Sequence, residues 1–277
     1  MAMARFTMPS VNSPKLRVRA RDYLVLVCLS LRVSAVHAQT DEIQVYDGEI
    51  AAPGQFTLVL HNNFTTSGSR QASFPGGVAS EGSLNGVPEW GYGVSDWFEA
   101  GLYLPVYTHT RDGKFLFDSV KLRALFVVPL ALQRRWFYGV NFELSYNARH
   151  WDQSRYSGEI RPIVGTHLGR WTLVFNPILD TSFDGLGNLD FAPAARVAFD
   201  LSEKWGLAVE HYADFGPVRH FVSKEDQAHT LFVVLDHSGH SGGFEFGIGH
   251  GLNRASDSLV FKLLLMRDLS PRPSSGR

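Results

Sequence analysis

About twelve segments of roughly ten residues, each alternating apolar and polar side chains, constrain the fold of this chain more than any other feature. Alternation with a period of two is typical of β-strands that have one apolar face. Gly, Asn, Asp, Ser or Pro bounds each segment, and these residues favour turns. The predicted strands cover residues 55–65, 87–95, 97–108, 118–128, 136–147, 157–168, 171–182, 190–200, 205–215, 227–237, 243–251 and 257–266.

The connections between these strands alternate between tight turns and longer polar loops. Ser95-Asp96 and Gly169-Arg170 are tight, whereas residues 66–86 and 216–226 are long. Short turns at one end and long loops at the other are typical of outer-membrane β-barrels, in which the short turns lie in the periplasm. A soluble β-sandwich gives no reason for this sidedness, although a soluble periplasmic β-protein stays open as the architectural alternative.

One face of each predicted strand is apolar, as in strand 97–108 from Phe98 to Val106, and we expect these faces to contact lipid. Pro177 and Pro193 lie inside predicted strands, where each removes a hydrogen-bond donor and predicts a bulge or weakened pairing. Four tryptophans follow short connections and predict a periplasmic aromatic girdle. They are Trp97, Trp136, Trp171 and Trp205.

The opposite faces carry charged side chains, which cannot lie in hydrocarbon without a large free-energy cost, so we expect them to line the barrel lumen. Their signs mostly alternate from strand to strand, which predicts ion pairs between neighbouring strands. A mixed-sign lumen favours ion pairs that hold the interior shut over ion pairs that line a selective passage. The predicted lumen-lining and solute-pathway residues are Glu99, Lys121, Arg123, Glu143, Glu159, Arg161, Asp180, Arg196, Glu210, Glu245 and Lys262.

The N-terminus has the pattern of an export signal. A basic stretch precedes the apolar run Tyr23 to Leu31, and small residues lead to Ala38, which predicts cleavage after that residue. The single cysteine, Cys28, lies in this segment. Cleavage after Ala38 would leave a chain with 20 basic and 26 acidic residues. We therefore predict a signal peptide at 1–38, a periplasmic N-terminal extension at 39–54, the barrel at 55–267 and a C-terminal tail at 268–277.

Several other classes of protein are excluded or disfavoured. The chain has no apolar run near 18 residues, as a membrane helix needs, and its net charge of -1 does not suit a nucleic-acid binder. No phosphate loop, dinucleotide fingerprint or zinc-ligand pairing is present, and His237-x-x-His240 lacks a third ligand, so we expect no cofactor and no metal. His211 and His250 lie near the predicted outer rim, where outer-membrane lipases place a histidine. No serine stands two residues after either, so we expect no enzyme.

One hairpin resembles a known family. The residues Tyr92-Gly93-Val94-Ser95-Asp96-Trp97-Phe98-Glu99-Ala100-Gly101 resemble the Y-G-[VL]-[ST]-D-x-x-E-x-G hairpin of outer-membrane proteins grouped with the phenol-degradation MetA-pathway family. The resemblance implies an outer-membrane barrel that passes small, often aromatic or apolar solutes. The chain departs from such barrels at its C-terminus, because a tail follows Met266 where an aromatic residue recognised by the insertion machinery is usual.

Together these features predict one all-β domain, an antiparallel transmembrane β-barrel of about twelve strands with both termini in the periplasm. We expect it in the outer membrane of a Gram-negative bacterium, where its partners would be outer-membrane lipid, the insertion machinery and a small-molecule solute, and not nucleic acid. The predicted function is that of a narrow, porin-like channel or transporter for small solutes. The alternatives are a structural or interaction barrel with a lumen plugged by ion pairs and, less favoured, a lipid-acting hydrolase.

Overall fold

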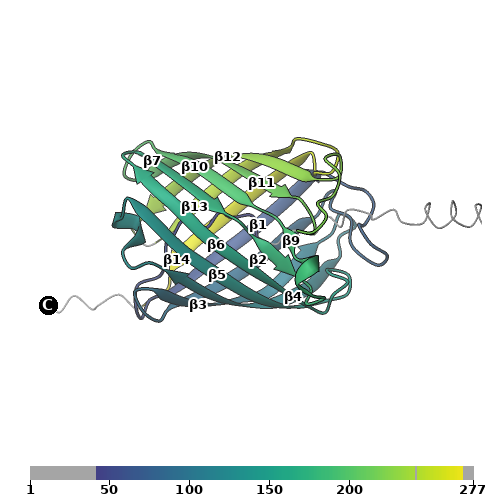
Figure 1. Ribbon diagram of the computed structural model, residues 1–277, viewed down its shortest axis with the longest axis horizontal. Coiled ribbons are helices and arrows are strands. Elements are labelled where there is room, and N and C mark those ends of the chain that lie inside the picture. Colours follow the sequence, from purple (N-terminus) through teal and green to yellow (C-terminus); the bar gives the residue numbers. More distant parts are fainter. Residues whose placement is uncertain (1–41, 241, 271–277) are drawn as a thin grey trace, which may run out of the picture. The chain divides into compact units, whose positions relative to one another are not determined.

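The computed structural model describes residues 42–240 and 242–270, so the predicted signal peptide and most of the predicted tail lie outside the described residues. The described chain forms a closed, twelve-stranded antiparallel β-barrel (Figure 1). Its strand segments are β1 Phe56–Ser67, β2 Leu84–Gly93, β3 Phe98–His109, β4 Phe115–Val127, β5 Trp136–Asn147, β6 Tyr156–Leu168, β7 Trp171–Asn176, β8 Leu179–Thr181, β9 Asp190–Phe191, β10 Ala194–Asp200, β11 Trp205–Asp214, β12 Ala228–Gly239, β13 Gly242–Gly251 and β14 Leu259–Asp268. Two short 3-10 helices, Ala131–Gln133 and Leu186–Asn188, lie in connections.

Pairing between the first and the last strand closes the barrel. β1 pairs antiparallel with β14 from Thr57↔Asp268 to Ser67↔Leu259, and the remaining strands pair with their neighbours in sequence. Closure leaves no free sheet edge, which is the condition under which strands can cross a membrane. The predicted all-β barrel is confirmed, and no helix among the described residues is long and apolar enough to span a membrane.

The two prolines inside predicted strands divide those strands. Pro177 lies between β7 and β8, and Pro193 lies between β9 and β10. β7 and β8 together form one strand of the barrel, and β9 and β10 together form the next. The two strands stay paired beside the prolines, because the Ala192 amide donates to the carbonyl of Ile178 at 3.1 Å. The weakened pairing that the sequence predicted is confirmed. It follows from the missing proline donor.

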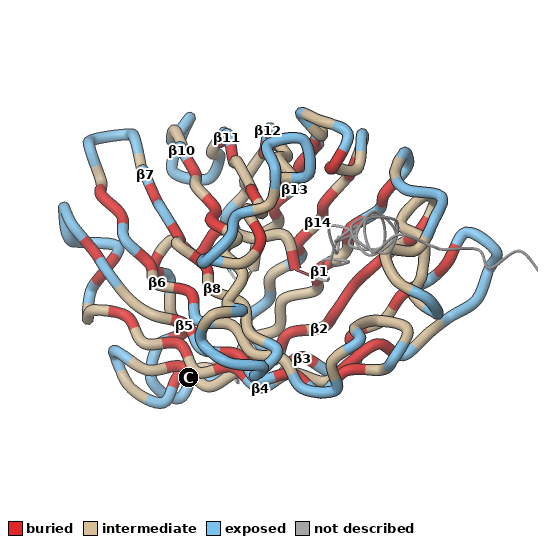
Figure 2. Tube along the Cα trace, turned by 45° about the vertical axis from the view of Figure 1, so that its right-hand side comes forward, coloured by how far each residue is buried: buried red, intermediate tan, exposed pale blue. Residues whose placement is uncertain are grey.

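Burial changes repeatedly along the strands (Figure 2), and the exposed fractions of successive residues indicate side chains that face the lumen and the outside in turn. On β5 the side chains of Trp136 and Tyr138 are 62% and 65% exposed, whereas Phe137 and Asn141 between and beyond them are 1% and 0% exposed. Val106 is the exception to the predicted apolar face of β3. A register shift after Tyr103 turns Val106 into the lumen, where it is buried.

The connections separate the two ends of the barrel. Residues 169–170 and 201–204 make short connections at one end, and 68–83 and 215–227 make long loops at the other (Figure 1). The four predicted girdle tryptophans all follow connections at the short-turn end, and their side chains are 40–62% exposed. The lumen therefore has one mouth surrounded by short turns and aromatic rings, and another surrounded by long loops.

Candidate functional site in the barrel lumen

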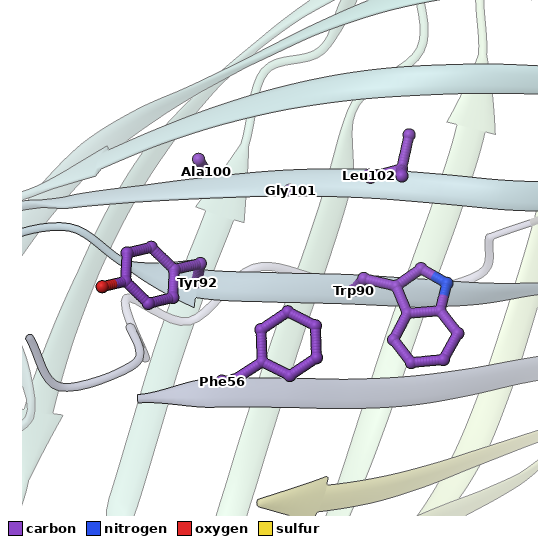
Figure 3. A pocket seen from close by; sticks show the side chains of 6 residues that line it. All are labelled: Phe56, Trp90, Tyr92, Ala100, Gly101 and Leu102. Atoms are coloured by element: carbon purple, nitrogen blue, oxygen red, sulfur yellow. The ribbon is translucent and has the colours of Figure 1, made fainter. Parts of the chain in front are cut away.

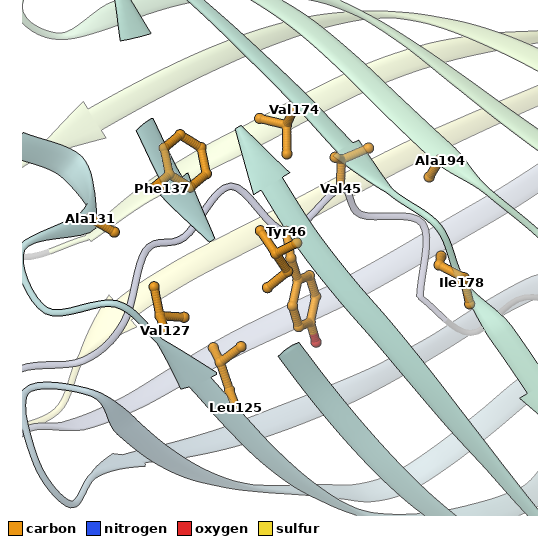
Figure 4. Close-up of a cluster of buried hydrophobic side chains, with 10 residues drawn as sticks. Val45, Tyr46, Leu125, Val127, Ala131, Phe137, Val174, Ile178 and Ala194 are labelled. Atoms are coloured by element: carbon orange, nitrogen blue, oxygen red, sulfur yellow. The ribbon is translucent and has the colours of Figure 1, made fainter. Parts of the chain in front are cut away.

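The described residues that precede β1, from Glu42 onward, extend into the barrel. Val45 and Tyr46 are 4% and 6% exposed, and they point among lumen-facing side chains of β4, β5 and β7 (Figure 4). We call residues 42–54 the lumen segment. The predicted periplasmic extension is thus wrong for these residues, because their polar backbone finds hydrogen-bond partners on the inner wall of the barrel.

The lumen segment is held by hydrogen bonds to its backbone. The Tyr46 amide donates to Asn176 Oδ1 at 2.8 Å, and Asn176 Nδ2 donates to the Tyr46 carbonyl at 3.0 Å. The Ala51 amide donates to Glu99 Oε2 at 2.6 Å, and Lys262 Nζ donates to the carbonyl of Ile43 at 3.2 Å. These bonds satisfy four backbone groups that no strand pairs, which lowers the free-energy cost of burying the segment.

Tyr46 and Arg161 fix the middle of the segment. The hydroxyls of Tyr46 and Tyr103 lie 2.7 Å apart, and the Arg161 guanidinium lies 4.5 Å from the centre of the Tyr46 ring. Arg161 Nη1 also donates to the Gln44 carbonyl at 3.0 Å and pairs with Glu42 at 3.4 Å. Arg161 on the barrel wall therefore contacts Glu42, Gln44 and Tyr46 of the lumen segment.

The segment turns toward the short-turn mouth at Gly48, whose φ of +87° disfavours any residue with a side chain. Phe137 of β5 packs directly against this glycine, because a Cβ at Gly48 would lie only 2.8 Å from Phe137 Cδ2. Phe137 belongs to a buried apolar cluster with Val45, Val127 and Ala131 (Figure 4). At this level the lumen is filled with apolar side chains.

A network of buried charges joins β10 to β14. Arg196 pairs with Glu210, with Asp236 at 2.5 Å and with Glu245 at 3.2 Å. Lys262 pairs with the same Glu210 and with Glu245 at 2.5 Å, and both Lys262 and Glu210 are fully buried. Two cations and three carboxylates thus cross the lumen side of five adjacent strands.

A second network joins β1 to β4. Arg123 Nη2 lies 2.9 Å from Glu89 Oε1 and also pairs with Glu99. His61 Nε2 lies 2.8 Å from the second oxygen of Glu89. Glu99 in turn accepts from the lumen segment at Ala51, so this network ties the wall to the segment.

The third group of charges lies on β4, β5, β6 and β8. Arg161 forms a bidentate pair with Glu159 at 2.7 and 2.9 Å, and Lys121 Nζ lies 3.7 Å from Glu143 Oε2. Asp180 lies opposite Glu159 in the strand register. All eleven residues predicted to line the lumen lie on inward-facing positions: eight are buried, and Lys121, Glu159 and Asp180 are partly buried.

The predicted alternation of sign holds for some neighbours and fails for others. Arg123 lies opposite Glu143, and Arg196 lies opposite Glu210. The sequence order predicted that Glu143 pairs with Arg161. In the structure the register of β5 and β6 differs by two residues, so that Glu143 lies opposite Glu159.

Sequence reasoning missed several lumen residues. His61, Glu89 and Asp236 share the inward phase of their strands, but apolar inward neighbours such as Val87 and Val234 hid that phase. Glu42 and Tyr46 had no periodic pattern around them at all. The only sequence signal for His61, Glu89 and Asp236 was the period-two alternation of inward positions, which also contains Glu99 and Glu210 on their strands.

The two histidines of the predicted outer rim are not arranged as a hydrolase triad. His211 Nε2 lies 3.3 Å from His229 Nδ1, and His250 Nδ1 lies 2.8 Å from the carbonyl oxygen of Ser258, which are not the partners of a hydrolase triad. No group of three or more metal-ligating side chains occurs among residues 42–240 and 242–270. A shallow apolar groove of about 400 Å³ lies on the barrel wall (Figure 3). Phe56, Trp90, Tyr92, Ala100, Gly101 and Leu102 line it.

Comparisons with known proteins show the fold. No protein-family model and no curated protein matches the sequence. An outer-membrane channel from Pseudomonas putida F1 superposes with a TM-score of 0.54 at 12% identity, over 82% of this chain and 100% of that chain. The NanC porin reaches a TM-score of 0.48 at 6% identity over 79% of this chain and 100% of that chain. LpxR from Salmonella typhimurium reaches 0.42 at 9% identity over 76% and 99%.

Proposed function

We propose that this protein is a narrow outer-membrane channel for small solutes, closed in this conformation by the lumen segment. The observation that carries the proposal is a lumen walled by charged side chains and filled by a peptide segment that leads into β1 through Gln55. Removal of that segment would take Val45 and Tyr46 out of the lumen and leave the charged side chains of the wall facing it. A barrel that served only as a rigid support would not need a polar wall beneath a removable segment.

The outer surface supports placement in a membrane. Outward side chains on adjacent strands, such as Leu122, Tyr138 and Leu144, are 48–65% exposed, which suits contact with lipid. The exposed tryptophans at the short-turn end suit the periplasmic interface of a Gram-negative outer membrane. Outer-membrane lipid and the insertion machinery are the partners that this placement entails. The resemblance to the MetA-pathway hairpin would make the solutes aromatic or apolar.

Substitution of Asn176 by alanine is expected to open the channel more often. The change removes two hydrogen bonds to the Tyr46 backbone, worth about 1 kcal/mol each, so the ratio of open to closed channels should rise about 5- to 30-fold. Single-channel recording of the refolded full chain in planar bilayers measures this ratio directly.

The matched control is Asn188→Ala, which removes an exposed asparagine from the loop between β8 and β9. It should leave the open fraction unchanged. Equal open fractions for Asn176→Ala and the unsubstituted chain, in protein that retains its barrel circular-dichroism spectrum, would refute gating by the lumen segment.

A structural or interaction barrel is the second candidate. The buried ion pairs that cross the lumen favour it, because such pairs also hold a wall rigidly in one register. Under this function the chain and every variant of the lumen segment stay silent in the bilayer, and the long loops 68–83 and 215–227 are the binding surface.

A further inference from the structure

Four carboxylates lie side by side across the lumen wall. Glu143 of β5 is opposite Glu159 of β6, Glu159 is opposite Asp180 of β8, and Asp180 is opposite Asp190 of β9. We call these four residues the carboxylate row. Like charges directly opposite each other destabilise a sheet, so a barrel selected for stability alone would not place four of them in register.

Cations compensate only part of this charge. Arg161 pairs with Glu159 and with Glu42 of the lumen segment, and Lys121 lies 3.7 Å from Glu143. Asp180 and Asp190 have no ion-pair partner among residues 42–240 and 242–270. The networks around Arg123 and Arg196 differ, because each of their carboxylates lies within ion-pair distance of a cation.

A neutral acceptor lies against the same row. Asn141 of β5 is fully buried, and its Nδ2 donates to Glu143 Oε1 at 2.9 Å. Its Oδ1 has no hydrogen-bond partner among the described residues. A buried amide oxygen without a donor costs about 1–3 kcal/mol unless a ligand or water satisfies it. The oxygen thus adds a second, independent indication that a donor-bearing or positively charged species occupies this part of the lumen.

We propose that the carboxylate row makes the channel selective for small cations. This inference rests on the proposed channel function and names its substrate class. Carboxylates on one side of a confined lumen create a negative potential that concentrates cations and repels anions. The row favours hydrated alkali ions and ammonium compounds over the neutral aromatic solutes that the hairpin resemblance implies.

The row is suited to passage rather than to tight binding. Its members are spread over four strand segments, and no group of three or more metal-ligating side chains among the described residues is close enough to hold a metal ion. Carboxylate and amide oxygens attract hard cations, and weak sites in sequence allow an ion both to enter and to leave.

The test is the reversal potential of the refolded full chain in a tenfold KCl gradient. We expect permeation of K⁺ to exceed that of Cl⁻ by about tenfold. Asp180→Asn with Asp190→Asn should lower this ratio by about fivefold or more, because it removes the two carboxylates that have no ion pair. The control pair Glu203→Gln with Glu225→Gln removes the same charge from exposed connections and should leave the ratio unchanged.

A conducting channel that prefers Cl⁻, or whose preference is the same in both double variants, overturns the cation inference and leaves the channel function standing. A bilayer that stays silent with both the full chain and Asn176→Ala overturns the channel function instead. In that case binding of Tb³⁺, followed by its luminescence when tryptophan is excited, still tests the row. Saturable binding that falls about tenfold in Asp180→Asn with Asp190→Asn supports the inference, and equal binding in that variant refutes it.

Discussion

Replacing Lys262 by methionine is expected to lower the free energy of unfolding of the barrel by about 3–5 kcal/mol. Lys262 and Glu210 are both fully buried, and Lys262 also pairs with Glu245. Methionine keeps most of the volume but removes the charge, so three carboxylates would share Arg196 alone. Breaking a buried ion pair is costly because the remaining charge is not solvated.

Urea unfolding of the protein in detergent or liposomes, followed by tryptophan fluorescence, measures this effect. Lys204→Met, in the exposed connection between β10 and β11, should change the free energy by less than about 0.5 kcal/mol. Adding Glu210→Gln to Lys262→Met should recover part of the loss, since it removes one of the uncompensated charges. A loss below about 1 kcal/mol for Lys262→Met would show that the network does not support the barrel.

Deletion of residues 42–53 is expected to convert a mostly closed channel into a mostly open one. Six hydrogen bonds to the wall, each worth about 0.5–1.5 kcal/mol, and the Arg161–Glu42 ion pair hold this part of the chain. Their loss, together with the loss of the steric block, should raise the time-averaged conductance by more than about tenfold. The wall should persist, since Arg161 keeps its bidentate pair with Glu159 and Arg123 keeps Glu89.

Planar-bilayer recordings of the deletion variant and of the full chain make this comparison. Deletion of residues 74–77, which lie in the long loop between β1 and β2, is the control and should leave the conductance unchanged. An equally low conductance for the 42–53 deletion would show that the ion pairs, and not the lumen segment, close the barrel.

The sequence predicted the strands well because a membrane barrel imposes a strict rule on each one. Every outward position must be apolar, so strands such as β5, from Trp136 to Asn147, were predicted with their observed bounds. Pro177 and Pro193 marked the two interrupted strands for an equally local reason, the missing amide donor. These features depend only on residues close together in the chain.

The organisation of the lumen depends on residues far apart in the chain and could not be predicted. The carboxylate row arises from the relative register of β5, β6, β8 and β9, which bulges and loop lengths decide. Residues 42–54 have no periodicity, and an acidic, polar composition suited a solvated extension as well as a segment that binds a polar lumen. The contacts of Tyr46 with Asn176 and Tyr103 span 130 and 57 residues of sequence.

The presence of residues 42–54 inside the folded barrel is the central claim, and thiol labelling tests it most directly. In a Cys28→Ser background, which contains no other cysteine, Val45→Cys and Asp112→Cys each supply a single thiol. Val45 is 4% exposed, whereas the Asp112 side chain, in the connection between β3 and β4, is 59% exposed. A charged maleimide should therefore label Val45→Cys about a hundredfold more slowly than Asp112→Cys in the folded barrel, and equally fast in urea. Equal rates in the folded barrel would contradict the account, because they would place the segment outside the lumen.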